Sequence, residues 1–425
     1  MKHRKYQFVL LFLSILLSWH ESFVIAQEST ITLKSCQETA ISNYPASKDK
    51  ELLKQVSLLK IRNLETNYLP QVTLNGQATY QSDAIQLNTP IMKINQPKDQ
   101  YKGSVDINQL IFDGGTNRYM KELESTSSEA DLQQVEVDLF KVREQVNNVF
   151  FLLISLQENE KLLKANLSII SEREKVVVSS VKQGVLTSSD LDVLQAEKLN
   201  TEQQLSDISI NRKSSLTILT ILTNKIVTDS SFFELPKIEL NVSDANIRPE
   251  YKLFDLQAKR FDDNRSLTGS MLMPKIYAFG EGGYGRPGLN MLSDKFSSFY
   301  IIGATLKWNL FDWNKNHRDK EVLDFQKQMV GTRRETFDKN LNVDLQNKMS
   351  SIQKLQEAIK RDVEILVLRH RITQTSSSRL DNGVITSTDY LTDFNAETVA
   401  KINAQTHIIQ LEQAKTAYLL AKGQY

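Results

Sequence analysis

The stretch "GVLTSSDL" at Gly184–Leu191 returns as "GVITSTDY" at Gly383–Tyr390, 199 positions later in a chain of 425 residues. The glycine that opens each copy favours the end of a helix, because glycine adopts left-handed backbone conformations at low cost. The Thr, Ser and Asp that follow are residues that cap and begin a helix. Each copy therefore predicts the tip of a helical hairpin, at residues 184–190 and again at residues 383–389.

Long helices precede and follow these tips. The eight prolines leave two stretches free of proline, residues 98–235 and 288–425, and proline is the residue that most strongly breaks a helix. In the first stretch apolar residues alternate steps of three and four: Leu132, Val135, Leu139, Val142, Val146, Val149, Leu153 and Leu156. That spacing is typical of a coiled coil and predicts a helix roughly 100 Å long at 1.5 Å per residue. We expect long helices at about 113–183 and 313–382, with return helices at about 191–227 and 390–421.

Two other segments alternate apolar and polar residues with the period of two that is typical of a strand. After Pro70 the sequence "QVTLNGQATYQ" begins such a strand, and its partner runs from Tyr101 to Phe112. The pattern returns after Pro274, so we expect β-hairpins at about 71–111 and about 275–310. Each strand has about ten residues, which is enough for a tilted strand to cross a bilayer.

Four strands cannot close a barrel, because about eight strands are the fewest that enclose packed side chains. An open sheet edge in lipid would leave amides and carbonyls unpaired. Strands in a membrane would therefore need several copies of the chain: two copies give about eight strands and a filled interior, and three give about twelve and a pore. Two alternatives stay open at this point, amphipathic hairpins lying on a soluble core and a plain structural coiled coil.

The two halves of the chain form a tandem repeat. Phe112-Asp113 corresponds to Phe311-Asp312 at the same offset of 199 that separates the two tips. Each repeat runs helix, strand, loop, strand, long helix, tip and return helix. We place the first repeat at residues 27–230 and the second at residues 231–425.

Residues 1–26 have the features of a cleaved signal peptide. Basic residues precede the apolar run Phe8–Leu17, which is too short for a spanning helix, and Ala26 supplies the small residue at the cleavage site. Without these residues the net charge of the chain is about −1, so no basic surplus attracts nucleic acid. We predict export and no nucleic-acid partner.

The sequence offers no enzyme, metal or cofactor site. Cys36 is the only cysteine, which excludes an intramolecular disulfide. The segment "GEGGYG" at Gly280–Gly285 has the spacing of a phosphate-binding motif, but a loop follows it instead of a helix. The histidines beyond the signal peptide, His317, His370 and His407, are too scattered to bind zinc. We therefore expect no catalytic activity, no metal and no cofactor.

The signal peptide, the strand entry "YLPQVTL", the strand-to-helix passage "QLIFDGG" and the duplicated tip pattern G-x-x-T-x-x-D together resemble the TolC family of outer-membrane efflux channels. The segments "LDVLQAE" and "DFNAE", which follow the two tips, are similar to that family too. The resemblance implies an α+β membrane protein whose long antiparallel helices form a periplasmic coiled-coil α-barrel. Its two β-hairpins would contribute four strands to a twelve-stranded transmembrane β-barrel shared by a homotrimer.

The resemblance also implies a passive exit duct in the outer membrane of a Gram-negative cell. Its partners would be outer-membrane lipid, a periplasmic adaptor protein and an inner-membrane pump, in a tripartite efflux pump or a type I secretion system. The cargo stays open among drugs, metal ions and polypeptides, and so does the pump class. A soluble periplasmic coiled-coil adaptor or structural protein is the alternative, and it leaves four membrane-length strands unexplained.

The family's functional residues correspond to three places in this sequence. The resemblance implies carboxylates around the periplasmic mouth, which makes Asp389 the gate residue; the next acid of the family falls on Thr392, and Asp393 follows it. The adaptor-docking tips are Gly184, Val185, Leu186, Thr187, Gly383, Val384, Ile385 and Thr386. The strand-to-helix turns are Asp113, Gly114, Gly115 and Asp312. In the second repeat Trp313 and Asn314 replace the two glycines of the turn, and asparagine tolerates the left-handed conformation.

Overall fold

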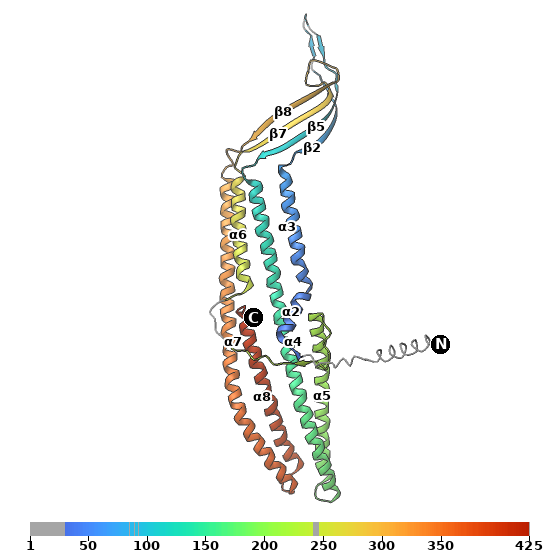
Figure 1. The fold of residues 1–425 in the computed structure, drawn as a ribbon, viewed down its shortest axis with the longest axis vertical. Coiled ribbons are helices and arrows are strands. Elements are labelled where there is room, and N and C mark those ends of the chain that lie inside the picture. Colours follow the sequence, from blue (N-terminus) through green and yellow to red (C-terminus); the bar gives the residue numbers. More distant parts are fainter. Residues whose placement is uncertain (1–29, 85, 89, 92, 241–245, 425) are drawn as a thin grey trace, which may run out of the picture. The chain divides into compact units, whose positions relative to one another are not determined.

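The computed structural model describes residues 30–84, 86–88, 90–91, 93–240 and 246–424 (Figure 1). The signal peptide predicted at residues 1–26 lies outside the described residues. In the described part of the chain, no helix combines the length and the apolar content that crossing a membrane requires.

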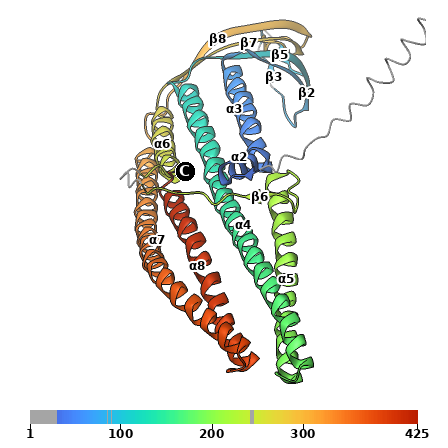
Figure 2. The ribbon, with the colours of Figure 1, turned by 60° about the horizontal axis from the view of Figure 1, so that its bottom comes forward.

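Two long helices and two return helices form the predicted hairpins (Figure 2). Helix α4 covers Thr116–Lys182 and helix α7 covers Lys315–Asp381, so both have 67 residues and both begin and end 199 positions apart. The return helices are α5, Ser188–Thr223, and α8, Ser387–Ala421, and they too begin 199 positions apart. The duplication read from the tips therefore extends over the full length of the long helices, and the predicted long antiparallel helices with their return helices are confirmed.

The chain divides into two compact units, each of which contains segments of both repeats. One unit takes its described residues from 1–43, 142–241 and 350–417, and the other from 44–141, 242–349 and 418–425. We call the first the tip unit, because it contains both tips, and the second the sheet unit. Helices α4 and α7 contribute residues to both units.

The sheet unit contains one four-stranded antiparallel sheet (Figure 1). Its strands are β2, Gln71–Tyr80; β5, Asp99–Phe112; β7, Lys275–Arg286; and β8, Ser297–Lys307. Their order in the sheet is β2-β5-β7-β8, so β2 and β8 are its edges. The segment that connects β2 to β5 in the sequence contains two short strands, β3 at Gln86–Asn88 and β4 at Lys93–Asn95. These two strands pair with each other in a separate sheet.

The register of the four strands gives the sheet one apolar and one polar face. Val72 lies beside Ile107 of β5, and further along the same row stand Gly280 of β7 and Ile302 of β8. On the opposite face Lys102 forms an ion pair with Glu281 at 2.5 Å. Because side chains alternate between the faces of a strand, the period-two pattern of each segment continues across all four strands.

Two further helices of the sheet unit run beside the first parts of α4 and α7. Helix α3, Asp49–Glu65, follows a short 3₁₀ turn at Pro45–Lys48, and a second turn at Thr66–Tyr68 leads from α3 to β2. Helix α6, Pro249–Ser270, is held to α7 by ion pairs such as Lys327–Asp262 at 2.8 Å and Arg334–Asp255 at 2.7 Å. It also buries Leu253 and Leu256 against Ala130 and Val137 of α4.

The tip unit begins with strand β1, Thr30–Ile31, which pairs in parallel with β6, Phe232–Phe233, and continues into helix α2, Leu33–Asn43. The heptad spacing of α4 predicts most of the α4 side chains that are buried in the core of the tip unit. Fully or almost fully buried apolar side chains of this part of α4 are Val142, Val146, Phe150, Phe151, Leu153, Ile154, Leu156, Leu163, Ile170 and Val177. The core of the tip unit thus follows the seam that the sequence predicts.

Candidate functional site

Each tip is closed by a reciprocal pair of hydrogen bonds between a Thr and an Asp. In the first tip the Asp190 N–H donates to the Thr187 hydroxyl at 3.3 Å, and the Asp190 carboxylate accepts from the Thr187 N–H at 3.1 Å. In the second tip the same bonds join Asp389 and Thr386, at 3.2 and 3.1 Å. This arrangement is a capping box, which satisfies amides that a helix start leaves without partners.

The glycine that precedes each capping box ends the preceding long helix. Gly184 has φ of 74° and Gly383 has φ of 70°, a left-handed conformation that side chains disfavour. Space around both glycines is open, since an added Cβ would meet no atom within 4 Å. The demand for glycine here is therefore one of backbone conformation alone.

The two tips of one chain are also bonded to each other. The second oxygen of the Asp190 carboxylate accepts a hydrogen bond of 3.0 Å from the Ser387 backbone N–H, at the start of α8. The Thr187 hydroxyl, together with the Ser387 and Thr187 N–H groups, holds the pKa of Asp190 below its ordinary value. The sequence alone suggested no more for Asp190 than a charge at a helix start, so this contact between tips was missed.

The apolar pair in each tip is divided between the core and the surface. Leu186 and Ile385 are partly buried against a cluster of apolar residues from α4, α5, α7 and α8. Val185 and Val384 project into solvent, with 62% and 63% of their surfaces exposed. Two equivalent apolar side chains are thus presented outward, while their neighbours stabilise the turn.

The residues predicted as a gate lie on α8, and each has a partner in the chain. Asp389 is exposed and caps its helix, and hydrogen bonds from the Thr386 N–H and hydroxyl hold its pKa below the ordinary value. Asp393 accepts a hydrogen bond from the Ser376 hydroxyl of α7. One oxygen of the Asp389 carboxylate takes part in the capping box. Its other oxygen corresponds to the Asp190 oxygen that accepts from Ser387 in the other tip.

Arg173 of α4 is a contact residue that the sequence analysis did not identify. Its guanidinium forms an ion pair with Asp381, donates to the Ser377 hydroxyl of α7, and lies 4.9 Å from the ring centroid of Tyr390 in α8. A signal was present, because the apolar heptad pattern lacks a member between Ile170 and Val177, and Arg173 lies in that gap.

Each strand-to-helix turn is built around a carboxylate, which is buried in the first repeat and partly exposed in the second. Asp113 is 3% exposed; one of its oxygens accepts from the Tyr68 hydroxyl at 2.8 Å and the other from the Asn117 N–H at 2.6 Å. In the second repeat Asp312 accepts from the Asn316 N–H at 2.8 Å. An anion at a helix N-terminus is favoured by the helix dipole, so each Asp fixes the start of a long helix.

The glycines of the first turn are required for conformation and for space. Gly114 has φ of 68°, and a Cβ there would lie 2.1 Å from the Cβ of Met273. In the second repeat Trp313 and Asn314 adopt the same left-handed conformation, at φ of 55° and 59°. The turn survives there as the sequence analysis expected for Asn314, although a bulky residue such as Trp313 rarely adopts this conformation.

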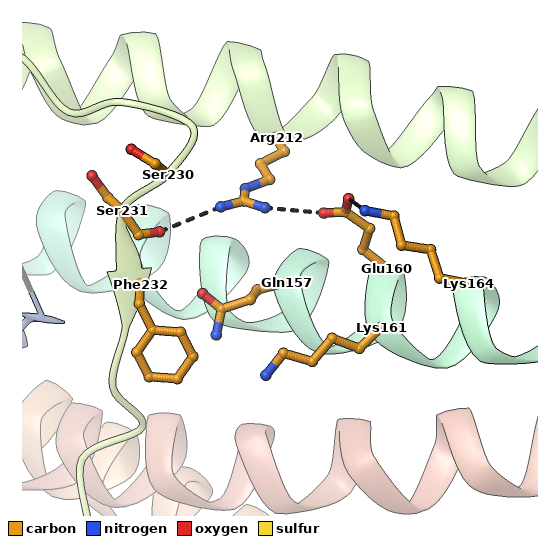
Figure 3. Close-up of a pocket in the computed structure, with 8 residues that line it drawn as sticks. All are labelled: Gln157, Glu160, Lys161, Lys164, Arg212, Ser230, Ser231 and Phe232. Atoms are coloured by element: carbon orange, nitrogen blue, oxygen red, sulfur yellow. Dashed lines mark hydrogen bonds and ion pairs between the residues drawn. The ribbon is translucent and has the colours of Figure 1, made fainter. Parts of the chain in front are cut away.

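A pocket of about 220 Å³ lies in the tip unit between α4, α5 and the segment that leads into β6 (Figure 3). Arg212 donates to Glu160 at 3.0 Å and to the Ser231 carbonyl at 3.3 Å, and Lys164 donates to the same Glu160 at 2.5 Å. Lys161 pairs with Glu158 at 2.8 Å and lies over the ring of Phe232. Glutamates of the chain pair with these three cations. The cluster therefore links α4 to α5 and to the segment that leads into β6.

Comparison with known proteins identifies the fold. Residues 40–225 match the family described as outer membrane efflux protein. No curated protein matches the chain. Among solved structures, the Campylobacter jejuni CmeC outer membrane channel is similar with a TM-score of 0.68 at 15% identity, covering 92% of this chain and 85% of that one.

Two more solved structures give the same result. The outer membrane protein VceC from Vibrio cholerae has a TM-score of 0.68 at 15% identity, with 92% of this chain and 96% of that chain covered. The open state of the Neisseria gonorrhoeae MtrE outer membrane channel has a TM-score of 0.66 at 14% identity, with coverage of 92% and 89%. The chain therefore carries the outer membrane efflux protein signature over residues 40–225 and the protomer fold of these channels over 92% of its length, and the resemblance to that family is confirmed.

Proposed function

We propose that this chain is the outer-membrane exit duct of a tripartite efflux pump or type I secretion system, a passive channel that works as a homotrimer. Substrate would arrive from an inner-membrane transporter through a periplasmic adaptor. The match of residues 40–225 to the outer membrane efflux protein family supports this role over that of an enzyme.

The observation that carries the proposal is the amphipathic sheet with two unpaired edges. Strands β2 and β8 each have one neighbour in the chain, and their outer sides leave a row of amides and carbonyls without partners in the sheet. Large apolar side chains on these strands are strongly exposed: Val72 at 66%, Leu74 at 80%, Tyr300 at 76% and Ile302 at 79%. Lipid would cover the apolar face, and β2 of the next copy would pair with β8.

The strand lengths suit that placement. The four strands have 10, 14, 12 and 11 residues, and a tilted transmembrane strand needs about 9–11. Three copies would supply about twelve strands and an interior wide enough for transport, whereas two would supply about eight and a filled interior. Export requires a pore, so the proposal takes three copies.

In the tips of the two helical hairpins, the exposed Val185 and Val384 are the proposed contacts for the adaptor. In a homotrimer the repeat would present six similar tips to a partner ring. Asp389 is the proposed gate carboxylate, and Asp393, four positions later on the same helix, is hydrogen-bonded to Ser376.

Membrane extraction and mass measurement test the proposal. The protein expressed with its signal peptide should resist salt washing and require detergent for extraction, and its detergent-corrected mass should be that of three chains. It should also form conducting pores in planar bilayers. Release by salt as a monodisperse monomer would overturn the proposal and favour the soluble periplasmic adaptor.

A further inference from the structure

The polar face of the four-stranded sheet carries two carboxylates side by side. Asp106 of β5 is the register partner of Glu281 of β7, on the two central strands of the sheet (Figure 1). Because side chains alternate between the faces of a strand, both carboxylates lie on the face opposite to Val72, Ile107 and Ile302. We call Asp106 and Glu281 the carboxylate pair.

The carboxylate pair breaks a rule of sheet stability. Like charges directly opposite each other on neighbouring strands destabilise a sheet. A residue choice that conflicts with a local rule is expected where function requires it. The pair therefore needs an explanation other than the stability of the sheet.

One ammonium group compensates half of the pair. Lys102 of β5 places its Nζ 2.5 Å from the Glu281 carboxylate and 5.3 Å from the ring centroid of Phe299. Asp106 accepts a hydrogen bond from the side-chain amide of Asn75. In the described part of the chain, no cation pairs with Asp106, and its other oxygen is buried without a hydrogen-bond donor. Each chain thus keeps one uncompensated carboxylate in this row.

Aromatic rings lie on both sides of the pair along the strands. The ring of Phe299 lies across Gly283, where an added Cβ would be 2.6 Å from the ring, and the ring of Phe279 lies across Gly303, where it would be 2.8 Å away. These two rows flank the row of Glu281 in the register of β7 and β8. Apolar walls beside charges of one sign focus their electric field.

The other charges on this face stand at the far end of the strands. Lys275 and Lys307 are register partners, and six residues separate Lys275 from Glu281. At about 3.3 Å per residue the separation is about 20 Å. Since charges more than about 10 Å apart are largely screened at about 0.1 M salt, the carboxylate pair acts independently of these lysines.

We propose that Asp106 and Glu281 form a charge filter in the lumen of the barrel, which favours cations over anions, and that Lys102 limits its strength. In the proposed trimer lipid covers the apolar face, so the opposite face lines the lumen, and the copies together place a ring of carboxylate pairs around the path of the cargo. Rings of charged side chains are a common means of ion selection. The inference rests on the proposed channel function and assigns charge preference to residues other than Asp389.

Reversal potentials in planar bilayers test the filter. The permeability ratio of K⁺ to Cl⁻ is measured in a gradient of KCl centred on about 0.1 M. Asp106→Asn removes the uncompensated charge and should lower the ratio by roughly threefold, whereas Lys102→Met exposes a second charge and should raise it by roughly threefold. Opposite shifts from two residues of one strand are not the result of a general loss of structure.

The matched control removes the same charge from the other face of the same strand. Asp99 of β5 is the register partner of Tyr80, so it belongs to the apolar face. Asp99→Asn should leave the ratio close to that of the parent. Equal shifts from Asp99→Asn and Asp106→Asn would overturn the filter, and so would a lowered or unchanged ratio in Lys102→Met.

Salt provides a second measurement on the same variants. At about 1 M salt charges are screened within about 3 Å, so the ratios of Asp106→Asn, Lys102→Met and the parent should converge. A difference of the same size at high salt would assign the effect to the shape of the pore and overturn the filter.

The outcomes separate the filter from the proposed function. A parent protein that forms no conducting pores overturns both. Conducting variants whose ratios all equal that of the parent overturn the filter and leave the channel intact.

Discussion

The Asp190 carboxylate accepts a hydrogen bond of 3.0 Å from the Ser387 backbone N–H, so two residues 197 positions apart in the chain join the two tips. The other oxygen of the same carboxylate closes the capping box of α5 with Thr187. One side chain therefore fixes both the start of its own helix and the position of the neighbouring tip.

Replacing Asp190 should loosen both tips at once. Asp190→Ala removes the cap and the contact with Ser387, at a cost of about 1–2 kcal/mol, and amide hydrogen exchange should accelerate in residues 184–190 and 383–389. Asp190→Asn should have a smaller effect, because its single amide oxygen can still accept one of the two hydrogen bonds. Faster exchange in the first tip only would show that the contact with Ser387 contributes nothing.

The tips should weaken in acid. Hydrogen bonds hold the pKa values of Asp190 and Asp389 below the ordinary value of an aspartate. A carboxyl whose folded pKa is depressed stabilises the fold above its unfolded pKa, and this contribution is lost as the pH falls through the folded pKa. Tip protection measured by hydrogen exchange should therefore be constant above about pH 5 and fall below about pH 4. The Asp190→Asn, Asp389→Asn double variant should show a flatter profile.

The gate and cap roles of Asp389 can be separated by two substitutions. Asp389→Asn removes the charge but keeps an acceptor for the Thr386 N–H, whereas Asp389→Ala removes both. If Asp389 acts as a pore carboxylate, both variants should conduct in planar bilayers with weaker block by divalent cations. Block that is unchanged in Asp389→Asn would assign the residue to capping alone.

Adaptor docking should depend on the outward valines. Val185→Glu with Val384→Glu places charges on exposed apolar positions, so cross-linking to the adaptor should fall at least tenfold, while the trimer persists. Leu186→Glu with Ile385→Glu changes residues that contact the tip cluster, and it should lower the stability of the protein itself. Normal adaptor cross-linking in the valine variant would remove these residues from the docking surface.

The buried seam of α4 sets the stability of the tip unit. Val146 is 0% exposed, so Val146→Asp buries a charge and should cost several kcal/mol, which denaturant unfolding and trimer yield would record. Val176→Asp is the matched control, since Val176 is 51% exposed on the same helix. A loss of the same size in both variants would mean that burial does not set the cost.

Much of this architecture follows from spacing in the sequence. Steps of three and four predicted α4 to within a few residues of its observed bounds, Thr116–Lys182, and period two predicted the four strands of the sheet. These features are local, because each residue's place on a helix or strand is set by its neighbours. The tips were equally local, since Gly184 and Thr187 carry the conformation and the cap themselves.

The contacts between hairpins did not follow from spacing. The bond from Ser387 to Asp190 and the ion pair of Arg173 with Asp381 join residues about 200 positions apart. Each depends on which helix lies beside which, and on the register of the two helices, neither of which a periodic pattern specifies. The division between Leu186 in the cluster and Val185 in solvent has the same origin.

The sheet of one chain has an even number of strands that alternate in direction, so its edge strands β2 and β8 run opposite to each other. In the proposed barrel this parity lets a neighbouring β2 continue the antiparallel order after β8 whatever the number of copies. The strands therefore do not determine the number of copies in the ring. The packing of the helices must determine it. A substitution that changes the packing angle between helices of neighbouring copies is expected to change the number of copies in the ring while the strands still pair.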